Sequence, residues 1–154
     1  YFKGKDIEDF KRKAEYFSLN YLQSILRVKA LEKISWHKSN GHTIVIVSAS
    51  IDLWLKPWCD KNGITLISTM LEVKDQIITG KTFKKNCYGL EKVKRIQELY
   101  NLSDYHYIYA YGNSRGDREM LGIASEPQKI TVGGLDIYLN YGSKEMELPF
   151  SLKL

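Results

Sequence analysis

The chain has 154 residues, of which 44% are hydrophobic and 27% charged, and its formal net charge is +5. This composition is typical of one soluble globular domain and excludes disordered and membrane-embedded chains. Because the basic residues are scattered among acids, the charge favours a small anionic substrate over nucleic acid.

We expect no signal peptide and no membrane span. We also expect Cys59 and Cys87 to be free thiols in a cytoplasmic protein.

The first forty residues carry two helical patterns. Asp6 is predicted to cap the first helix, because a carboxylate there accepts a bond from an amide of the first turn. The apolar residues that follow recur at steps of three and four: Ile7, Phe10, Ala14, Phe17 and Tyr21.

Residues 28–37 predict a second helix that ends at Gly41. We expect His37 and His42, which flank that end, to pack or to lie at the surface rather than to bind a metal.

The first strand is predicted at Thr43–Val47, where the β-branched run TIVIV is typical of a strand buried on both faces of a parallel sheet. Ser48-Ala49-Ser50 is expected to end this strand and to lead into a helix that reaches Asn62. Pro57 should kink or restart that helix, because proline removes a helical hydrogen bond. Ile64–Ser68 predicts the second strand.

A small hairpin and a helix are predicted next. Leu71–Val73 and Ile77–Thr79 read as the two strands of the hairpin, and Gly89–Tyr100 reads as the helix. The inner face of that helix is predicted from its apolar spacing: Val93, Ile96, Leu99 and Tyr100.

The order of the elements predicts the fold class. Tyr107–Tyr111 is another apolar strand, and Lys129–Val132 predicts a last strand before Gly133-Gly134, whereas the residues from Leu135 onward show no clear pattern. Strands and helices alternate from Thr43, which predicts an α/β fold with a parallel sheet and right-handed crossovers. Ligands in such folds bind beyond the carboxyl ends of the strands.

The most informative stretch, YIYAYGNSRGDREML, combines a strand, a tight polar loop and a helix start. Gly112 ends the strand, and Asp117 stands where a helix cap would. Asn113 and Asp117 then bring two oxygen-bearing side chains over one crevice, as a hard cation such as Mg²⁺ requires. A capped turn that holds no ligand is the alternative interpretation.

Two further features predict a phosphate site at the same edge. Ser48 offers a hydroxyl at a strand end, and the amides of Ala49 and Ser50 are expected to begin the next helix, where anions bind well. Lys92, in the first turns of its helix, supplies a positive charge. Taken singly, a Ser such as Ser48 is more often a capping residue, and most lysines on helices, like Lys92, are solvated.

The sequence resembles the haloacid dehalogenase-like (HAD) superfamily, specifically its subfamily IB of phosphoserine phosphatase-like enzymes. The resemblance runs from about Ile34 to Ala124, through HKSNGHTIVIVSASIDLWLKPWCDKNGI, TMLEVKDQIITGK, NCYGLEKVKRI and YAYGNSRGDREML. It implies a Rossmann-like, three-layer α/β core with a helical cap. It also implies that Ser48 and the Ala49 amide bind phosphate, that Lys92 neutralises the phosphoryl group, and that Asn113 and Asp117 hold Mg²⁺.

The sequence departs from the family pattern in two places. Position 113 is Asn where the family usually has Asp, which keeps a ligating oxygen but removes a charge. The family's nucleophile, the first Asp of a DxDxT-type motif, has no counterpart here, since Asp6-Ile7-Glu8 lies in a helical pattern. We therefore expect residues 1–28 to be the C-terminal part of the cap and 29–154 to be the core without its first strand.

These expectations lead to one function and one alternative. The resemblance implies Mg²⁺-dependent hydrolysis of a small phosphomonoester through an aspartyl-phosphate, with phosphoserine, another small phosphomonoester or a lipid phosphate as substrate. The alternative is an inactive fragment or a domain that binds phosphorylated ligands without turnover. In the resembled fold the first strand lies between Thr43–Val47 and Tyr107–Tyr111, so we expect both strands to have an unpaired inner edge. They should close on each other, recruit another copy or promote aggregation.

Overall fold

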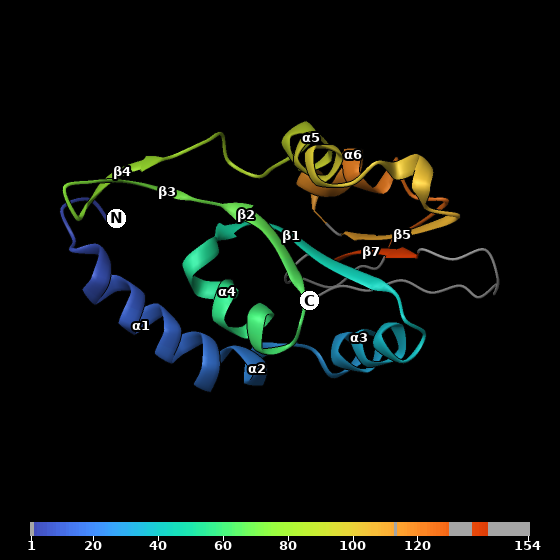
Figure 1. Ribbon diagram of the computed structural model, residues 1–154, viewed down its shortest axis with the longest axis horizontal. Coiled ribbons are helices and arrows are strands. Elements are labelled where there is room, and N and C mark those ends of the chain that lie inside the picture. The colour runs from blue at the N-terminus through green and yellow to red at the C-terminus, as the bar shows by residue number, and fades with distance from the viewer. Residues whose placement is uncertain (1, 113, 130–136, 142–154) are drawn as a thin grey trace.

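Five strands form one sheet in the order β2-β1-β7-β5-β6. The computed structural model describes residues 2–112, 114–129 and 137–141, and the sheet runs through the middle of the molecule (Figure 1). The strands are β1 (Thr43–Ile51), β2 (Thr65–Thr69), β5 (Tyr107–Gly112), β6 (Glu126–Lys129) and β7 (Ile137–Tyr141). β1 pairs in parallel with β2, and β5 pairs in parallel with β6. The predicted α/β class is confirmed.

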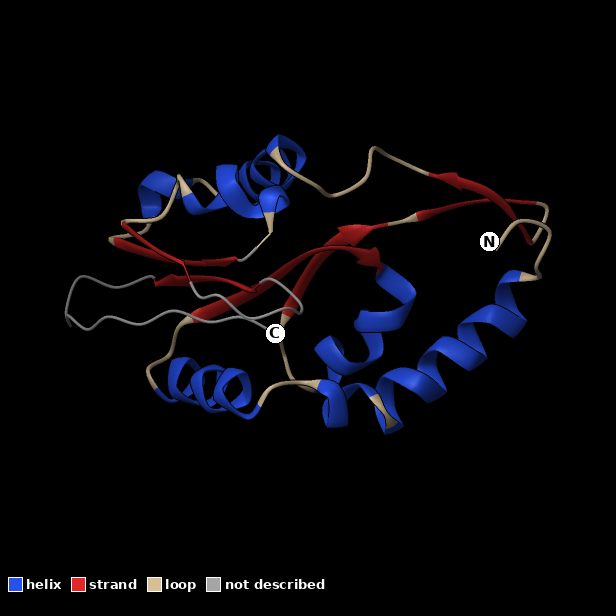
Figure 2. Cartoon of the chain, turned by 180° about the vertical axis from the view of Figure 1, so that it is seen from behind, coloured by secondary structure: helices blue, strands red, loops and turns tan. Residues whose placement is uncertain are grey.

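Helices cover both faces of the sheet and give the molecule three layers (Figures 1 and 2). The helices of the two outer layers are α3 (Val28–Ser39) and α4 (Asp52–Lys61) on one side and α5 (Leu90–Leu99) and α6 (Arg118–Leu121) on the other. β1 is apolar on both sides because each side meets a helical layer. Ile44 and Ile46 pack with α3 and α4, whereas Val45 and Val47 pack with α5 and α6.

The N-terminal helix α1 (Ile7–Asn20) begins as predicted, because the Asp6 carboxylate accepts a bond from the Asp9 N–H at 2.9 Å. α2 (Leu22–Ile25) links it to α3. α1 packs on α4 and on the predicted hairpin, which the structure contains as β3 (Leu71–Lys74) and β4 (Ile77–Thr82). The division into a cap over 1–28 and a core over 29–154 stays a prediction.

β1 is longer than predicted, and this moves the start of α4. The strand continues to Ile51, and its register against β2 shifts between Ser48 and Ile51, so Ala49 and Ser50 form a bulge. α4 begins at Asp52. The prediction that the amides of Ala49 and Ser50 begin a helix is therefore wrong, because the extra residues of a bulge keep the chain in the sheet.

Pro57 lies inside α4, which continues from Asp52 to Lys61 without restarting. A proline in a helix interrupts the hydrogen bonds around it. The N–H of the next residue, Trp58, instead donates to the hydroxyl of Ser18 at 3.1 Å. Ser18 is buried on α1, so α1 stabilises α4 at the position where its own ladder is weakest.

The centre of the sheet differs from the prediction. β7 lies between β1 and β5 and pairs antiparallel with both, with Ile137 opposite Ile46 and Tyr138 opposite Ala110. The sheet is therefore mixed, and the expectation of unpaired inner edges on β1 and β5 is wrong along the paired residues. A later segment of the chain supplies the missing partner, which was not among the expected outcomes. Self-association stays a prediction.

Smaller differences concern the ends of elements. Leu99, predicted on the inner face of α5, is 61% exposed, because α5 ends at this residue. Tyr21 is also exposed, since α1 ends at Asn20. The last predicted strand is placed earlier, at Glu126–Lys129, and residues 130–134 lie outside the described residues. Cys59 and Cys87 are buried and free of disulfide bonds, and none of the helices in the described ranges is long and apolar enough to cross a membrane.

Candidate functional site

Several of the predicted site residues meet at the carboxyl ends of β1 and β5. Val47 and Ser48 come from the end of β1, and Lys92 comes from α5. Asp117 ends a short 3-10 turn, η2 (Arg115–Asp117), in the loop that follows β5. Contact between Lys92 and Asp117 joins segments 25 positions apart in the sequence. The edge of the sheet is the one at which α/β folds bind ligands.

Lys92 lies between a carboxylate and a main-chain carbonyl. Its Nζ donates to Asp117 Oδ1 at 2.7 Å and to the carbonyl oxygen of Val47 at 3.0 Å. The Lys92 side chain is 1% exposed and that of Asp117 is 0% exposed. A buried ammonium requires partners of this kind, because its desolvation costs several kcal/mol. Lys92 is thus not a solvated surface lysine, and its charge is held at the end of β1.

The carboxylate of Asp117 is held on both sides. While Oδ1 accepts from Lys92, Oδ2 accepts from the N–H and the hydroxyl of Ser114, each at 2.7 Å. Asp117 occupies the position before α6, but its side chain makes no cap bond to that helix. The prediction of a helix-capping Asp117 is therefore wrong in its detail: the side chain turns back and fastens its own loop.

Two glycines allow this close arrangement. A Cβ on Gly112 would lie less than 3.0 Å from the Cβ and Cγ of Asp117. A Cβ on Gly116 would come equally close to the ring of Tyr88. The Gly89 N–H also donates to the carbonyl of Gly116 at 3.0 Å. The loop around Asp117 is therefore packed directly against the segment that begins α5.

Ser48 lies near this pair, although in a different setting from the predicted one. Its side chain is buried, and its hydroxyl oxygen accepts a bond from the Ser50 N–H at 3.0 Å. Ala49 and Ser50 are exposed in the bulge. The hydroxyl therefore organises the bulge, in which Ala49 is an exposed residue at the strand end.

The fit of these residues to Mg²⁺ depends on oxygen donors. Asp117 supplies a carboxylate of the hard type that Mg²⁺ prefers, and each of its oxygens can accept more than one bond. Asn113, the other predicted ligand, lies outside the described residues. The described ranges contain no group of three or more His, Cys, Asp or Glu side chains that could hold a metal by themselves. Asp117 thus fits the predicted role of one ligand and cannot form a site alone.

Sequence reasoning missed the residues that position this edge. The guanidinium of Arg95 is buried and donates to the carbonyls of Ser68, at 2.7 Å, and of Lys85. The Thr69 hydroxyl donates to Asn86 Oδ1 at 2.7 Å. These bonds fasten the segment before α5 to the end of β2. Ser114 was detectable, because a Ser three residues before an acid is a capping-box pattern, whereas the role of Arg95 has no local sequence signal.

A second buried polar cluster lies on the other face of the sheet. His37 is fully buried, with its Nδ1 2.6 Å from Nδ1 of His42 and its Nε2 3.0 Å from the hydroxyl of Tyr111. Burial, the neighbouring His42 and Lys33 lower the pKa of His37 from 6.5 to about 3. We call His37, His42 and Tyr111 the His37 cluster. The interpretation of both histidines as packing residues agrees with their ring contacts to Trp36.

Comparison with known proteins identifies the family. The sequence model of haloacid dehalogenase-like hydrolases matches residues 1–122. Protein CicA of Caulobacter vibrioides, in two strains, is 34% identical over 128 residues, which make up 82% of this chain and 57% of CicA. A crystal structure of a protein with unknown function from Bordetella pertussis Tohama I has a TM-score of 0.68 at 20% identity and covers 81% of this chain and 58% of that one, a likeness of fold alone. The chain thus spans little more than half the length of these relatives. Because the family match covers most of its residues, the chain belongs to the haloacid dehalogenase-like hydrolases.

Proposed function

We propose that the chain carries the phosphate- and Mg²⁺-binding part of a phosphomonoester hydrolase of the phosphoserine phosphatase-like group, subfamily IB. The observation that carries this proposal is the buried contact of 2.7 Å between Lys92 and Asp117 at the carboxyl end of β1. A fixed positive charge beside a carboxylate, at a sheet edge that also bears Ser48, suits a phosphate bound next to a cation.

Each residue has a role in this proposal. Lys92 neutralises the phosphoryl oxygens, and the hydroxyl of Ser48 and the amide of Ala49 orient them. Asp117 and Asn113 hold Mg²⁺, which when bound screens the charge between the phosphate and an attacking carboxylate. The family resemblance also implies an Asp nucleophile that becomes an aspartyl-phosphate. A DxDx[TS] motif does not occur in the 154 residues, so we expect hydrolysis only from a longer chain that contains one.

The second candidate function is binding of a phosphorylated ligand without turnover. The same missing motif favours it, and Asn113 in place of a second carboxylate adds to it. Lys92 and Ser48 would then bind a phosphate that nothing attacks. For either function we propose a small phosphorylated ligand, a cytoplasmic location and no nucleic-acid partner. The name of protein CicA states no activity that would distinguish the two.

Calorimetric titration of this chain with inorganic phosphate, in the presence and absence of Mg²⁺, tests the shared part. We expect Mg²⁺ to strengthen phosphate binding, and Lys92→Gln to weaken it at least tenfold in protein that circular dichroism shows to be folded. Lys29→Gln, which removes an exposed lysine of α3, is the matched control. Equal affinity in Lys92→Gln and Lys29→Gln would overturn the assignment of the phosphate site.

Phosphate release separates the two candidate functions. The chain as given should release none from phosphoserine, whereas a version extended upstream to include a DxDx[TS] motif should be active and lose activity when the first Asp is replaced. An inactive extended chain that still binds phosphate would favour the binding function.

The metal ligand is tested by Asn113→Asp. The added charge should tighten Mg²⁺ binding about tenfold, since a carboxylate is a stronger ligand for a hard cation than a carboxamide. Unchanged or weaker affinity would remove Asn113 from the proposed ligands.

A further inference from the structure

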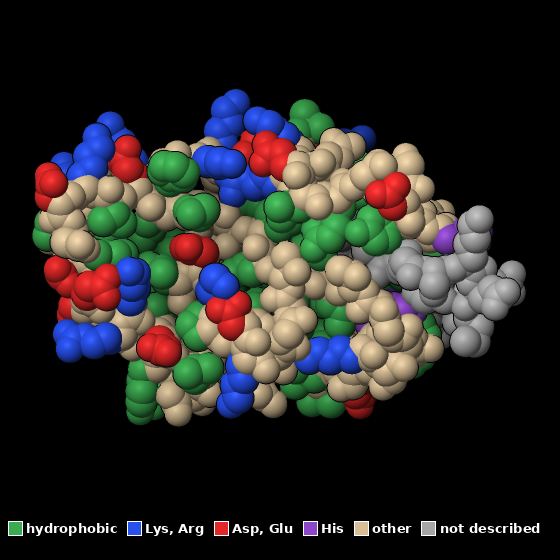
Figure 3. Space-filling model, in the orientation of Figure 1, with side chains coloured by type: hydrophobic (Ala, Val, Ile, Leu, Met, Phe, Trp, Pro, Cys, Tyr) green, Lys and Arg blue, Asp and Glu red, His purple; other side chains and the backbone are tan. Residues whose placement is uncertain are grey.

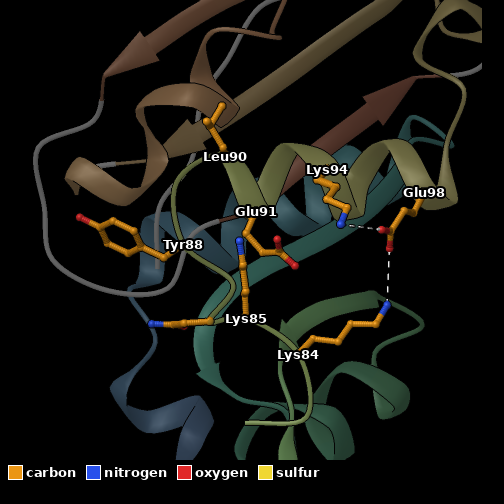
Figure 4. A pocket seen from close by; sticks show the side chains of 8 residues that line it. Lys84, Lys85, Tyr88, Leu90, Glu91, Lys94 and Glu98 are labelled. Carbon is orange, nitrogen blue, oxygen red and sulfur yellow. Dashed lines mark ion pairs between the residues drawn. The ribbon is translucent and has the colours of Figure 1, made fainter.

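A lysine-rich groove lies between α5 and the segment that precedes it. We name it the lysine groove, and its volume is about 840 Å³. Its lining residues are Lys84, Lys85, Asn86, Tyr88, Leu90, Glu91, Lys94 and Glu98. Figure 4 shows Lys84 and Lys94 reaching toward Glu98 from the two walls of the groove. On the surface, blue Lys and Arg side chains gather along the edge of the molecule that carries β4 and α5 (Figure 3).

The acids of the lysine groove do not balance its cations. Glu91 Oε1 accepts from Arg95 Nε at 2.9 Å, so its charge is already matched by a buried guanidinium. Glu98 is the nearest acid to two lysines, 3.7 Å from Lys84 Nζ and 3.9 Å from Lys94 Nζ. Both distances are longer than a hydrogen bond. One loosely shared carboxylate therefore faces two exposed lysines, with Lys85 as a further cation in the lining.

The lysine groove is connected to the candidate site through Tyr88. The Tyr88 ring lies against Gly116, next to Asp117, and is 50% exposed. Leu90, also in the lining, is exposed as well. In Figure 4 these two side chains lie at the end of the groove away from Glu98. A molecule bound at Lys92 that extends over Tyr88 would thus enter the groove along an apolar wall.

The geometry of α5 gives the length of such a molecule. Lys92 points toward the sheet, and Lys94, two residues later, is turned by about 200° around the helix axis. The two lysines therefore lie on opposite sides of the helix. A ligand that reaches both must pass around the start of the helix, so its charged groups must lie at least as far apart as a helix with its side chains is wide, roughly 10 Å.

We propose, on the basis of the phosphatase or phosphate-binding function above, that the lysine groove binds a second anionic group of the phosphorylated substrate, a carboxylate or a further phosphate at least about 10 Å from the first. Its lysines select substrates longer than phosphoserine itself, and Tyr88 contacts the part that links the two charges. This predicts that affinity depends on charge at a distance from the reacting phosphate.

Two matched pairs of probes test this by calorimetric titration with Mg²⁺ present. One pair is the C-terminally amidated peptides phosphoserine-glycine-aspartate and phosphoserine-glycine-asparagine, of which only the first carries a carboxylate. The other pair is a nucleoside bisphosphate and its monophosphate. We expect the member that carries the additional charge in at least one pair to bind roughly two- to fivefold more tightly, the range of exposed ion pairs. The pair that shows the difference identifies carboxylate or phosphate.

Lysine variants locate the effect. Lys84→Gln with Lys94→Gln should abolish the difference within the pair, while Lys29→Gln with Lys61→Gln, which removes the same charge from exposed positions elsewhere, should preserve it. Added salt should reduce the difference, because exposed charges are screened. Equal affinity within both pairs, or a difference that survives the Lys84 and Lys94 changes, overturns the groove assignment. Absence of any phosphate binding sensitive to Lys92 would instead overturn the proposed function.

Discussion

Two of the buried polar clusters, which lie on opposite faces of the sheet, differ in charge. On one face of the sheet, Lys92 and Asp117 form an ion pair at 2.7 Å with almost no exposure. On the other face, the His37 cluster links two imidazoles and a phenol. Burial lowers the pKa of His37 to about 3, lowers that of His42 and raises that of Tyr111, so the three groups are neutral at pH 7. Both clusters adjoin β5. The His37 cluster includes Tyr111 of that strand, and Asp117 lies in the loop that follows its last residue, Gly112.

The difference follows from where each cluster lies. The His37 cluster is enclosed by aromatic rings of Trp36 and Tyr109, which offer no counter-charge. Burial then favours the neutral form. The Lys92 pair lies at the end of the strands, where each charge has a partner and further hydrogen bonds. Burying charge is costly, and an ion pair retained at a sheet edge is the more informative sign of a binding function.

Breaking the ion pair should have the largest effect. Asp117→Asn keeps the shape of the side chain but removes the negative charge that contacts the buried Lys92 ammonium at 2.7 Å. We expect a loss of about 3–5 kcal/mol in the free energy of unfolding, measured by urea denaturation. Asp60→Asn is the control, because Asp60 pairs with Lys56 at 2.6 Å on the exposed surface, where such pairs contribute less than about 1 kcal/mol. Similar losses in both variants would contradict the burial argument.

Crowding the site loop should come next. Gly112→Ala places a methyl group against Asp117, and overpacking of this kind costs about 1–3 kcal/mol. Gly116→Ala is the comparison, since its added methyl group meets the Tyr88 ring, which is half exposed and can rotate away. We expect the Gly116 variant to lose less stability in the same denaturation experiment. The reverse order would mean that Tyr88 is held more rigidly than Asp117.

Acid should destabilise the protein through the His37 cluster. The pKa of His37 is 6.5 when unfolded and about 3 when folded, so between these values only the unfolded chain takes up the proton. The stabilising effect is complete above pH 6.5 and declines as the pH falls toward 3. Between pH 7 and pH 5 it should decline by about 2 kcal/mol.

Comparison of wild type with His37→Gln isolates this contribution from that of the carboxylates. Denaturation curves at both pH values should show a smaller loss in the variant. If the two proteins lose the same stability on acidification, His37 is not buried as a neutral imidazole.

The smallest effect is expected for Tyr111→Phe. This change removes the hydroxyl that lies 3.0 Å from His37 Nε2 and should cost about 1 kcal/mol, the usual value for one hydrogen bond. Tyr16→Phe, on an exposed ring of α1, should change stability by less than about 0.5 kcal/mol. Thermal unfolding at pH 7 compares the two variants. If Tyr111→Phe leaves the stability unchanged, the contact adds no stability.

The sequence predicts most of the fold because the decisive elements carry strong local signals. The run at Thr43–Val47 and the strand that ends at Gly112 are apolar on both faces, as a covered sheet requires. β7 was not predicted. A segment of five residues is too short to show a clear hydrophobic period. In the resembled fold, the position between β1 and β5 that β7 occupies belongs to a parallel strand. The bulge at Ala49 and Ser50 was also missed, because register against a neighbouring strand is not a local property.

The candidate site is predicted in part for the same reason. The sequence patterns identified Lys92 and Asp117, and the structure brings them together. Whether they bind phosphate and Mg²⁺ stays a prediction, as do the roles of Ser48, Ala49 and Asn113. Arg95 and Tyr88 hold the site in place through residues that are far from them in the sequence. Arg95 donates to the carbonyl of Ser68, and the Tyr88 ring lies against Gly116. No spacing rule in a single sequence encodes such contacts.

In the proposed function, the bond between Lys92 and Asp117 also couples the phosphate-binding half of the site to the Mg²⁺-binding half. An anion that takes Lys92 as its partner leaves a buried carboxylate in need of positive charge. A cation bound by Asp117 leaves a buried ammonium in need of negative charge. Either ligand alone competes with the existing ion pair, whereas the two together replace it with two new ones. Cation and anion should each raise the affinity for the other by the same factor, because thermodynamic coupling between two sites is reciprocal.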